Sequence, residues 1–422
     1  MLRRLSGAIG GNVALSAEVA GFIDDVRRDR DAALVAHMKA FSDPDFDASM
    51  IRVSPQLIQL AVDRVDSELR NALERALNHV RRYQEHIAPP LLPDTKVDDA
   101  SLGLRFEPIQ SVGLLVPGGR ASYPSTLLML AVPAQVAGVE RICLATPPPD
   151  LDRGLTPHGP QIADEVLATA FLLDIDEVYC IGGSHAAAAL AIGTQTVQSV
   201  DFIAGPGSVY VQEAKRQLFG IVGVDGLYGP SEIAILADGT ANPSWVAADV
   251  LAQLEHDPGA AFVVSEHVEV LEAVQAQLNQ QLSERGRQAG IQRGIERSAA
   301  FVLAANRNEA CTIMNRLAAE HAVLAVADPH KLLESLKSSG AYFLGSAPVA
   351  SGDYYAGPSH CLPTGSTGRF SSGCSVYTFL RRASVEEYPH GMSHQTIHDI
   401  ATIALAEGLD AHAASVRIRE DS

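Results

Sequence analysis

Aromatic residues are scarce in this chain, and no two of its cysteines are close together in the sequence. Phe, Trp and Tyr make up 5% of the 422 residues, although hydrophobic residues make up 47%. This apolar content is enough for two or more cored domains and excludes a disordered or fibrous chain. The cysteines are Cys143, Cys180, Cys311, Cys361 and Cys374. Their spacing indicates neither a disulfide framework nor a thiolate zinc site, and it fits a reducing cytoplasm.

The chain also lacks basic charge and long apolar runs. Its net charge is −18 at pH 7, and this field would repel both nucleic acid and an anionic membrane surface. A small-molecule partner is therefore favoured. The apolar residues after Arg4 are interrupted by Gly7, Gly10 and Gly11 and are too short for a signal peptide or a membrane span. We expect no targeting segment and a cytoplasmic protein.

Strands that alternate with helices dominate the rest of the sequence. Residues 16–42 and 54–86 have the apolar spacing of helices, and Pro89, Pro90 and Pro93 end the second region. The predicted strands are 112–116, 141–145, 177–181, 201–204, 232–237, 261–265, 301–305, 323–327 and 341–344. Such alternation predicts an α/β fold of parallel sheets with helices on both faces, and the number of strands predicts two doubly wound domains.

Three of these strands end in glycine-rich turns that open helices, at 117–119, 182–184 and 205–207. Glycine lets the backbone turn tightly and lets a phosphate approach the helix N-terminus. None of the turns has the spacing of the dinucleotide fingerprint, so each alone is as readily a plain strand-to-helix turn. Together, at the carboxyl ends of one sheet, they favour a nucleotide site.

One predicted helix carries a candidate metal-binding pair near its C-terminal end. Asn242 is its cap, Pro243 is its first residue and Pro258 stops it. Gln253 and His256 are three residues apart, so both would point the same way, toward a cleft at the end of the helix. Taken alone, such a pair is more often a solvated helix face than a metal site.

Later polar residues strengthen the case for a catalytic metal site. Glu320 and His321 are adjacent and could act as an acid and base pair. Asp353 and His412, with the Gln and His of the preceding helix, would supply the oxygen and nitrogen ligands that suit zinc. These residues also have plain structural interpretations. Glu320 and His321 could be a charge pair at a helix end, Asp353 a turn former and His412 a surface residue.

Seven motifs occur in order along the chain. They are Val-Pro-Gly-Gly-Arg-Ala-Ser-Tyr-Pro-Ser (116–125), Gly-Pro-Ser-Glu (229–232), Gln-Leu-Glu-His-Asp-Pro (253–258), Glu-His (320–321), Gly-Asp-Tyr-Tyr-Ala-Gly-Pro-Ser-His-Cys-Leu-Pro-Thr-Gly (352–365), Gly-Arg-Phe-Ser-Ser (368–372) and Glu-Gly-Leu-Asp-Ala-His (407–412). In these motifs, and from about residue 20 to the end, the chain resembles the histidinol dehydrogenases. The resemblance implies an NAD-dependent, zinc-containing enzyme that oxidises L-histidinol through the aldehyde to L-histidine, the last steps of histidine biosynthesis, with two NAD per turnover.

The resemblance also implies an architecture of two doubly wound, incomplete Rossmann-like domains with small helical N- and C-terminal segments. The expected boundaries are 1–23 for the N-terminal segment, 24–110 plus 232–376 for the domain with the zinc and catalytic residues, 111–231 for the nucleotide-binding domain and 377–422 for a C-terminal dimerisation segment. In the family this tail reaches into the neighbouring subunit. A homodimer is thus implied, in which His412 and Glu407 complete the partner's site.

Site residues follow from the resemblance position by position. The zinc ligands fall on Gln253, His256, Asp353 and His412, and the metal also holds the substrate's amine and imidazole. His321 would take the hydroxyl proton, and Glu320 would activate the water that attacks the aldehyde. Other substrate contacts fall on Ser231, His360 and Glu407, and NAD contacts fall on Tyr123, His185 and Ser208.

Four positions depart from the family's pattern. His185 and Ser208 stand where Gln and Asn are usual, and Ala322-Val323 stands where Leu-Glu is usual. Both substitutes at the NAD positions can still donate hydrogen bonds to a phosphate or ribose. Two alternatives therefore stay open: a paralogue that oxidises another small alcohol, and a non-catalytic protein that binds a nucleotide or imidazole ligand for regulation.

Overall fold

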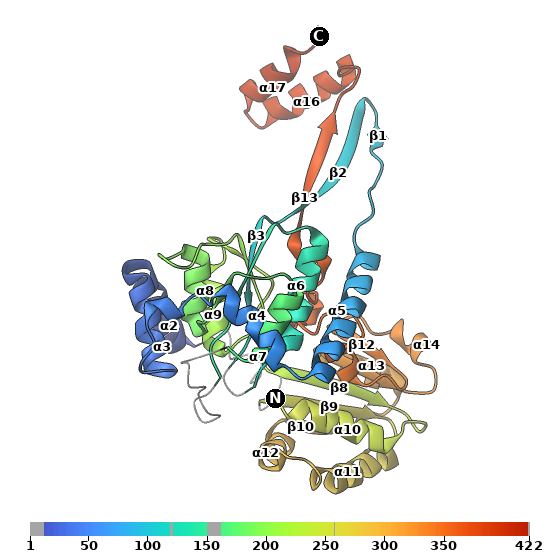
Figure 1. Ribbon diagram of the computed structural model, residues 1–422. Helices are drawn as coiled ribbons and strands as arrows, with labels where there is room; N and C mark the ends of the chain where they lie inside the picture. Colours follow the sequence, from blue (N-terminus) through green and yellow to red (C-terminus); the bar gives the residue numbers. More distant parts are fainter. Residues whose placement is uncertain (1–11, 119–120, 150–161, 257, 421–422) are drawn as a thin grey trace. The chain divides into compact units, whose positions relative to one another are not determined.

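The structure, a computed structural model, describes residues 12–118, 121–149, 162–256 and 258–420 (Figure 1). The chain forms two compact units, one from Met1–Ile87 with Ile109–Phe379 and the other from Ala88–Pro108 with Leu380–Ser422. Within the described ranges, no helix has the length and apolar content that a membrane span requires. The second unit thus combines a segment from the first quarter of the chain with the C-terminal segment.

The first unit contains two parallel five-stranded sheets, and the first sheet has the strand order β5-β4-β3-β6-β7. Its strands are β3 (Ser111–Leu115), β4 (Arg141–Ala145), β5 (Val178–Tyr179), β6 (Phe202–Ala204) and β7 (Gly223–Val224). Helices α6 (Pro124–Ala137) and α7 (Asp164–Leu172) contact each other, and so do α8 (Gly183–Ile192) and α9 (Val209–Leu218). The winding direction reverses between β3 and β6, which is where doubly wound sheets bind ligands.

Four N-terminal helices cover this first layer. Within the described ranges they are α2 (Val13–Asp29), α3 (Asp31–Phe41), α4 (Pro55–Arg64) and α5 (Ser67–Ile87), with the short helix η1 (Ala48–Met50) between α3 and α4. Because α2 packs on α8 and α5 packs on α6, both inner helices are apolar all round. The prediction of one helix over 16–42 was wrong at Arg30, whose φ of 55° breaks the α-helical path.

The second sheet of this unit has the order β10-β9-β8-β11-β12, again all parallel. Its strands are β8 (Ser231–Ala237), β9 (Gly259–Ser265), β10 (Ala299–Leu303), β11 (His321–Ala325) and β12 (Ala341–Leu344). Its helices are α10 (Pro243–Leu254), α11 (Val268–Leu282), α12 (Gln288–Ser298), α13 (Arg307–Leu317), α14 (Pro329–Leu333) and α15 (Val349–Tyr354), before the short helices η3 (Thr367–Arg369) and η4 (Val376–Phe379). Alternate residues of β8 enter the cores on opposite faces, so its sequence is apolar throughout.

The second unit is an antiparallel sheet followed by a helix pair. Strands β1 (Thr95–Val97), β2 (Ala100–Pro108) and β13 (Leu380–Glu387) pair in that order, and β2 and β13 form the long ribbon in Figure 1. Helices α16 (His394–Ala406) and α17 (Asp410–Arg417) pack on each other through a small core. The Asp99 carboxylate accepts hydrogen bonds from the Ser393 amide and the Thr396 hydroxyl, which ties the start of α16 to the turn between β1 and β2.

The predicted fold class is confirmed, because the chain has two Rossmann-like parallel sheets and helical terminal segments. All nine predicted strands are present. The antiparallel sheet and the two-residue strand β7 were not predicted from the sequence. Residues of β2 and β13 are mostly exposed or half-buried, so they lack the apolar run or alternation that identifies a strand. Of the predicted N-terminal segment 1–23, residues 1–11 lie outside the described ranges.

The five cysteines are free, and each is buried. Burial raises the pKa of the Cys143 and Cys180 thiols to about 12. The Cys374 amide donates a hydrogen bond to the Cys361 carbonyl, with an N···O distance of 2.8 Å. Since the thiolate is the reactive form, none of the five is a reactive thiol.

A buried ion pair holds the turn after β6. The Lys215 ammonium and the Asp225 carboxylate are completely buried, with an N···O distance of 2.5 Å. Lys215 also donates to the Gly205 carbonyl at 2.9 Å, and Asp225 accepts from the Gly205 amide at 2.8 Å and from the Tyr228 hydroxyl at 2.9 Å. Both groups are therefore satisfied, which a buried ion pair requires.

We predict that Lys215→Met lowers the free energy of unfolding by roughly 3 to 5 kcal/mol, because it leaves the Asp225 carboxylate buried without its countercharge. Urea unfolding followed by circular dichroism measures the loss. The matched control is Arg27→Met, which breaks the exposed pair with Asp24 and should cost less than about 1 kcal/mol. Equal losses for the two variants would contradict the prediction.

Candidate active site

A cavity of about 280 Å³ in the first unit is lined from both parallel sheets. From the first sheet come residues after the carboxyl ends of β3 and β6, namely Pro117, Tyr123, Ser125, Thr126, Pro206, Gly207 and Ser208. From the second sheet come Ser231 at the start of β8 and Glu320 and His321 at the start of β11. The cavity thus lies at the switch point of the first sheet and at the amino ends of the second. The remaining lining residues are Tyr228, Gly229, His256, Asp353, Tyr354, His360, Cys361, Leu362 and Thr364.

The turns of the first sheet approach one another closely at this edge. Gly205 has a φ of 124°, and a Cβ there would lie 2.1 Å from the Leu115 carbonyl oxygen. A Cβ on Gly118 would lie 2.5 Å from the Pro147 carbonyl oxygen. Glycine is therefore required at both positions by packing, whether or not a phosphate binds. The nucleotide role of these turns stays a prediction.

The Glu320 carboxylate is buried just before β11. Its Oε2 accepts hydrogen bonds from the Ser231 hydroxyl at 2.6 Å and from the Glu232 backbone amide at 3.0 Å. Burial raises the pKa of Glu320, while the nearby His321 and these donors oppose the shift. A carboxyl with a raised pKa is a stronger base than an ordinary glutamate, which suits proton abstraction from water.

The His321 ring is fixed by its Nδ1. This atom lies 3.1 Å from the Glu232 carbonyl oxygen, which can only accept, so Nδ1 carries the proton of the bond. Nε2 lies 3.3 Å from Asp353 Oδ1 but without hydrogen-bond geometry, and it has no hydrogen-bond partner among the described residues. Burial alone would lower the pKa of His321, but the Glu320 and Asp353 carboxylates outweigh it and raise the pKa to about 9.

Glu232 is a further site residue, which ends the Gly-Pro-Ser-Glu motif (229–232) but has no role predicted from the sequence. Its amide and carbonyl hold Glu320 and His321, and its side-chain Oε1 accepts from the Gly365 amide at 3.1 Å. The other carboxyl oxygen is buried without a partner. Burial, with the charge of Glu320, raises the pKa of Glu232 to about 7. A charged residue at the start of a buried strand was the only signal in the sequence.

The structure places three of the four predicted zinc ligands in the first unit. Gln253 is in the last turn of α10, 3% exposed, and its Nε2 has no hydrogen-bond partner within the described part of the chain. His256 is exposed in the turn after α10, and both it and Asp353 line the cavity. Among the described residues, no three His, Cys, Asp or Glu side chains are already grouped as a metal site.

His360 is held by two partners from different parts of the unit. Its Nδ1 lies 2.7 Å from the Asp353 carbonyl oxygen and therefore donates, and its Nε2 lies 3.1 Å from the Thr126 hydroxyl. Burial lowers the pKa of His360, which favours this neutral form. The ring therefore links α6 of the first layer to the segment after α15.

The three predicted NAD contacts are not together. Tyr123 and Ser208 precede α6 and α9 and line the cavity, and the Ser208 hydroxyl makes no capping hydrogen bond in its own helix. His185, in the first turn of α8, is outside the cavity lining, and its ring stacks on His37 with centroids 3.9 Å apart. Burial lowers the pKa of both histidines to about 4.

The remaining predicted residues lie elsewhere. Glu407 is the C-cap of α16 and His412 is in α17, so both belong to the second unit, where they are exposed. Ala322 and Val323, where the resemblance leads us to expect Leu and Glu, do not line this cavity. Instead they are buried in the cores on the two faces of β11. Their substitution thus leaves the wall of this cavity unchanged.

The fold and the cavity together define a class of protein. Two Rossmann-like parallel sheets line one cavity, and a buried carboxyl and imidazole pair faces it. This combination is typical of an α/β oxidoreductase of the dehydrogenase type.

Comparisons with known proteins give the family. The sequence model of histidinol dehydrogenase matches residues 11–420. The histidinol dehydrogenase of Synechococcus sp. is 41% identical over 408 residues, which cover 96% of this chain and 92% of the relative. That of Agrobacterium fabrum is 42% identical over 410 residues, with the same coverage. The crystal structure of histidinol dehydrogenase from Elizabethkingia anophelis matches with a TM-score of 0.90 at 30% identity. The match covers 99% of this chain and 95% of the chain in that crystal structure. The chain belongs to the histidinol dehydrogenase family of oxidoreductases.

We predict that Glu232→Gln changes the pH dependence of stability. The pKa of this carboxyl is 4.5 in the unfolded chain and about 7 in the folded one, so the folded state favours the neutral acid. Its stabilisation is fully present below pH 4.5 and is lost as the pH rises through 7. Glutamine stays neutral, so the variant should gain up to about 3 kcal/mol on the parent between pH 5 and pH 8.

Urea midpoints at the two pH values, read by circular dichroism, measure this gain. Glu272→Gln is the control, because the Glu272 side chain is exposed on α11 and its substitution should leave the pH dependence unchanged. If Glu232→Gln and the parent lost the same stability between pH 5 and pH 8, Glu232 would be ionised in the folded protein at both pH values, which would contradict the prediction.

Proposed function

We propose that the protein catalyses the NAD-dependent, four-electron oxidation of L-histidinol, through L-histidinal, to L-histidine in histidine biosynthesis. The observation that carries this proposal is the buried Glu320–His321 pair, whose two groups face one cavity with different hydrogen-bond partners. Two successive oxidations need one base for the alcohol proton and one for a water proton. The relatives named histidinol dehydrogenase, at 41% and 42% identity, support the same reaction.

The available donor set fits zinc. We propose that Gln253, His256 and Asp353 hold the ion together with His412 of the partner subunit. The Gln253 amide supports this, because its nitrogen is buried without a partner and the group is therefore not fully used by the fold. Mixed nitrogen and oxygen ligands with an open position are typical of catalytic zinc. When bound, zinc would supply positive charge that holds the substrate's amine and imidazole and polarises its hydroxyl group.

The first sheet would bind NAD, which accepts a hydride in each oxidation. Tyr123 and Ser208 support this assignment, since both line the cavity at the switch point between β3 and β6. The uncommitted Ser208 hydroxyl is free to donate to a ribose or phosphate oxygen. His185, at the N-terminus of α8, would contact the cofactor outside the cavity.

The proton steps follow from the two bases. His321 has its Nδ1 proton committed to the Glu232 carbonyl, so Nε2 would accept the hydroxyl proton during alcohol oxidation. A cation bound to Asp353 would compensate one of the carboxylates that raise the pKa of His321, which favours the neutral base. Glu320, oriented by Ser231, would take a proton from the water that adds to the aldehyde.

The other proposed substrate contacts come from the start of β8, from the segment after α15 and from the partner's second unit. Ser231 and His360 line the cavity and would hydrogen-bond the substrate, and Glu407 would pair with its ammonium group. We propose that Glu407 and His412 complete the site of the partner in a homodimer. The proposed domains are 24–110 plus 232–376 for zinc and catalysis and 111–231 for NAD, with 1–23 and 377–422 as terminal segments.

The reaction itself is tested by following NADH absorbance after L-histidinol is added, beside a panel of other small alcohols. We expect two NADH per L-histidinol. His321→Asn should slow alcohol oxidation by about 100-fold or more, and Glu320→Gln should impair oxidation of L-histidinal more than Tyr123→Phe does. Equal losses in both steps for both catalytic variants would contradict the roles, and a different preferred alcohol would contradict the substrate.

The metal assignment predicts about one zinc per purified chain by elemental analysis. Asp353→Asn should lower the zinc content while the circular dichroism spectrum stays unchanged, because the carboxylate is a ligand and not a core residue. Asp63→Asn, at an exposed position of α4, should keep the full zinc content. Fully active protein without bound metal would refute the assignment.

The shared-site proposal predicts rescue when two inactive variants exchange subunits. His412→Asn and His321→Asn would place both defects in one site of a mixed dimer and leave the other site intact. Random exchange should then return about a quarter of the native activity, since about half of the dimers are mixed. No rescue despite proven exchange would mean that each site is built from a single chain.

A further inference from the structure

A second cavity, of about 510 Å³, lies at the opposite edge of the second sheet from the catalytic one. Residues after the carboxyl ends of β8, β11 and β12 line it, including Thr240, Val326 and Ser346. The sheet order is β10-β9-β8-β11-β12, so the winding direction reverses between β8 and β11. This is the position at which doubly wound sheets bind ligands. In the second sheet, the catalytic groups instead occupy the amino ends, which leaves this crevice outside the proposed reaction.

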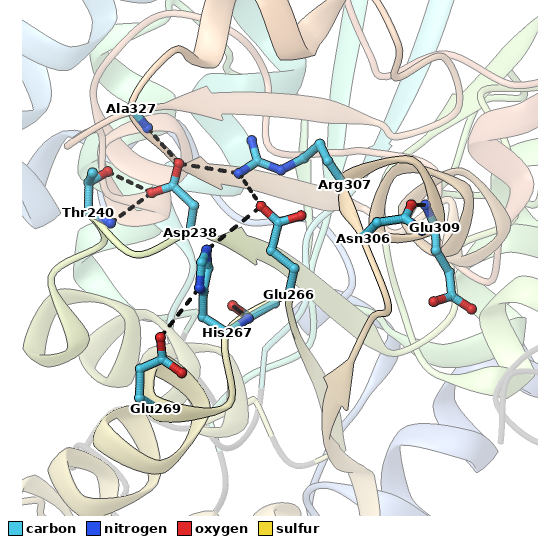
Figure 2. A network of polar contacts seen from close by, with 10 residues as sticks. Asp238, Thr240, Glu266, His267, Glu269, Asn306, Arg307, Glu309 and Ala327 are labelled. Carbon is cyan, nitrogen blue, oxygen red and sulfur yellow. Dashed lines mark hydrogen bonds and ion pairs between the residues drawn. The ribbon is translucent and has the colours of Figure 1, made fainter.

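Two of the loops that line the cavity, those after β8 and β11, are joined by a polar network (Figure 2). The Asp238 carboxylate accepts hydrogen bonds from the Thr240 amide and hydroxyl, at 2.9 and 2.6 Å, and from the Ala327 amide at 3.0 Å. Arg307 joins Asp238 to Glu266, with N···O distances of 3.4 and 2.8 Å. The loops after β8, β9 and β11 are thereby fixed before any ligand arrives. A preformed cavity binds without the entropy loss of ordering its walls.

The lining has one aromatic ring and one carboxyl group. Trp245, the only tryptophan of the chain, is 58% exposed there, although tryptophan is usually well buried. Asp249 is one turn further along α10, so the two side chains share a face of the helix. Burial raises the pKa of Asp249 to about 6. Most of the other lining residues are small or apolar, and none is Lys or Arg, so the lining does not suit a phosphate.

We infer that this cavity binds a small molecule that carries a planar ring and a protonated amine. The ring would pack on Trp245 and the apolar wall, and the ammonium group would pair with Asp249, which has no other countercharge in the lining. The volume lies within the usual range for small-molecule sites, about 300 to 1,000 Å³. This inference is independent of the proposed reaction, because none of its residues lines the catalytic cavity.

The test uses the fluorescence of Trp245, which reports on this cavity alone because the chain has one tryptophan. The holoenzyme is titrated with benzylamine, which has both features, and with phenylacetate and n-butylamine, which each lack one. Benzylamine should change the emission along a saturable curve. Each control should need at least about ten times the concentration, since it loses either the ion pair or the ring contact.

Asp249→Asn should weaken benzylamine binding by at least about tenfold, whereas the exposed substitution Asp63→Asn should leave it unchanged. A second variant, Ala347→Leu, fills the cavity from the loop after β12 and leaves the sequence of α10 unchanged. It should also abolish the saturable response. A linear response, an equal response to phenylacetate, or unchanged binding in folded Asp249→Asn and Ala347→Leu would overturn the inference. An emission that no probe alters, as expected if another subunit covers the cavity, would overturn it as well.

Discussion

Three ionisable side chains, Glu232, Glu320 and His321, are buried at the starts of β8 and β11, and the candidate active site depends on how their charges are stabilised. The parallel register sets His321 beside Ile233, which brings Glu320 beside Glu232 on the neighbouring strand. The backbone of Glu232 then donates to Glu320 and accepts from His321. Buried charges are stable only when they are paired and hydrogen-bonded, so the strand pairing that builds the sheet also builds the acid and base pair.

This constraint explains why the two sheets contribute opposite edges. In the first sheet the tight turns after β3 and β6 reach the cavity, as the usual rule for doubly wound folds predicts. In the second sheet, the amino end of β8 brings the backbone donor and acceptor of Glu232 next to Glu320 and His321. The carboxyl edge of that sheet is then free. Helix α10 and strand β11 each run from one cavity to the other. Trp245, in the first turn of α10, lines the second cavity, and His321, the first residue of β11, lines the candidate active site.

Much of the fold could be predicted from the sequence, because buried parallel strands are short apolar runs between helices. The predicted cap of α10 is confirmed in detail, since the Asn242 side chain accepts from the Ser244 amide. The break at Arg30 could not be predicted. Arginine has no preference for a positive φ, and the Arg30 guanidinium bonds to the Gly193 carbonyl, which is distant in the sequence. The long ribbon of the second unit was missed because its exposed faces leave no hydrophobic pattern.

The candidate site was less predictable than the fold. The motifs gave the residues, and the structure brings Ser231, His256, Glu320, His321, Asp353 and His360 to one cavity. The role of Glu232 could not be read from the sequence, because it acts through its backbone, which any residue type could supply. The stacking of His185 on His37 was equally inaccessible, since it depends on how α3 packs on α8.

The five buried thiols give the protein a practical property. All of the native cysteines lie in the first unit and are protected from reagents in the folded state. A cysteine introduced at an exposed position of α16 or α17 would therefore be the one thiol that a maleimide dye modifies under native conditions. The lone tryptophan, Trp245, lies in the first unit and can serve as the energy donor. With a single engineered cysteine, movements of the C-terminal helices could then be followed by resonance energy transfer from Trp245 to the dye.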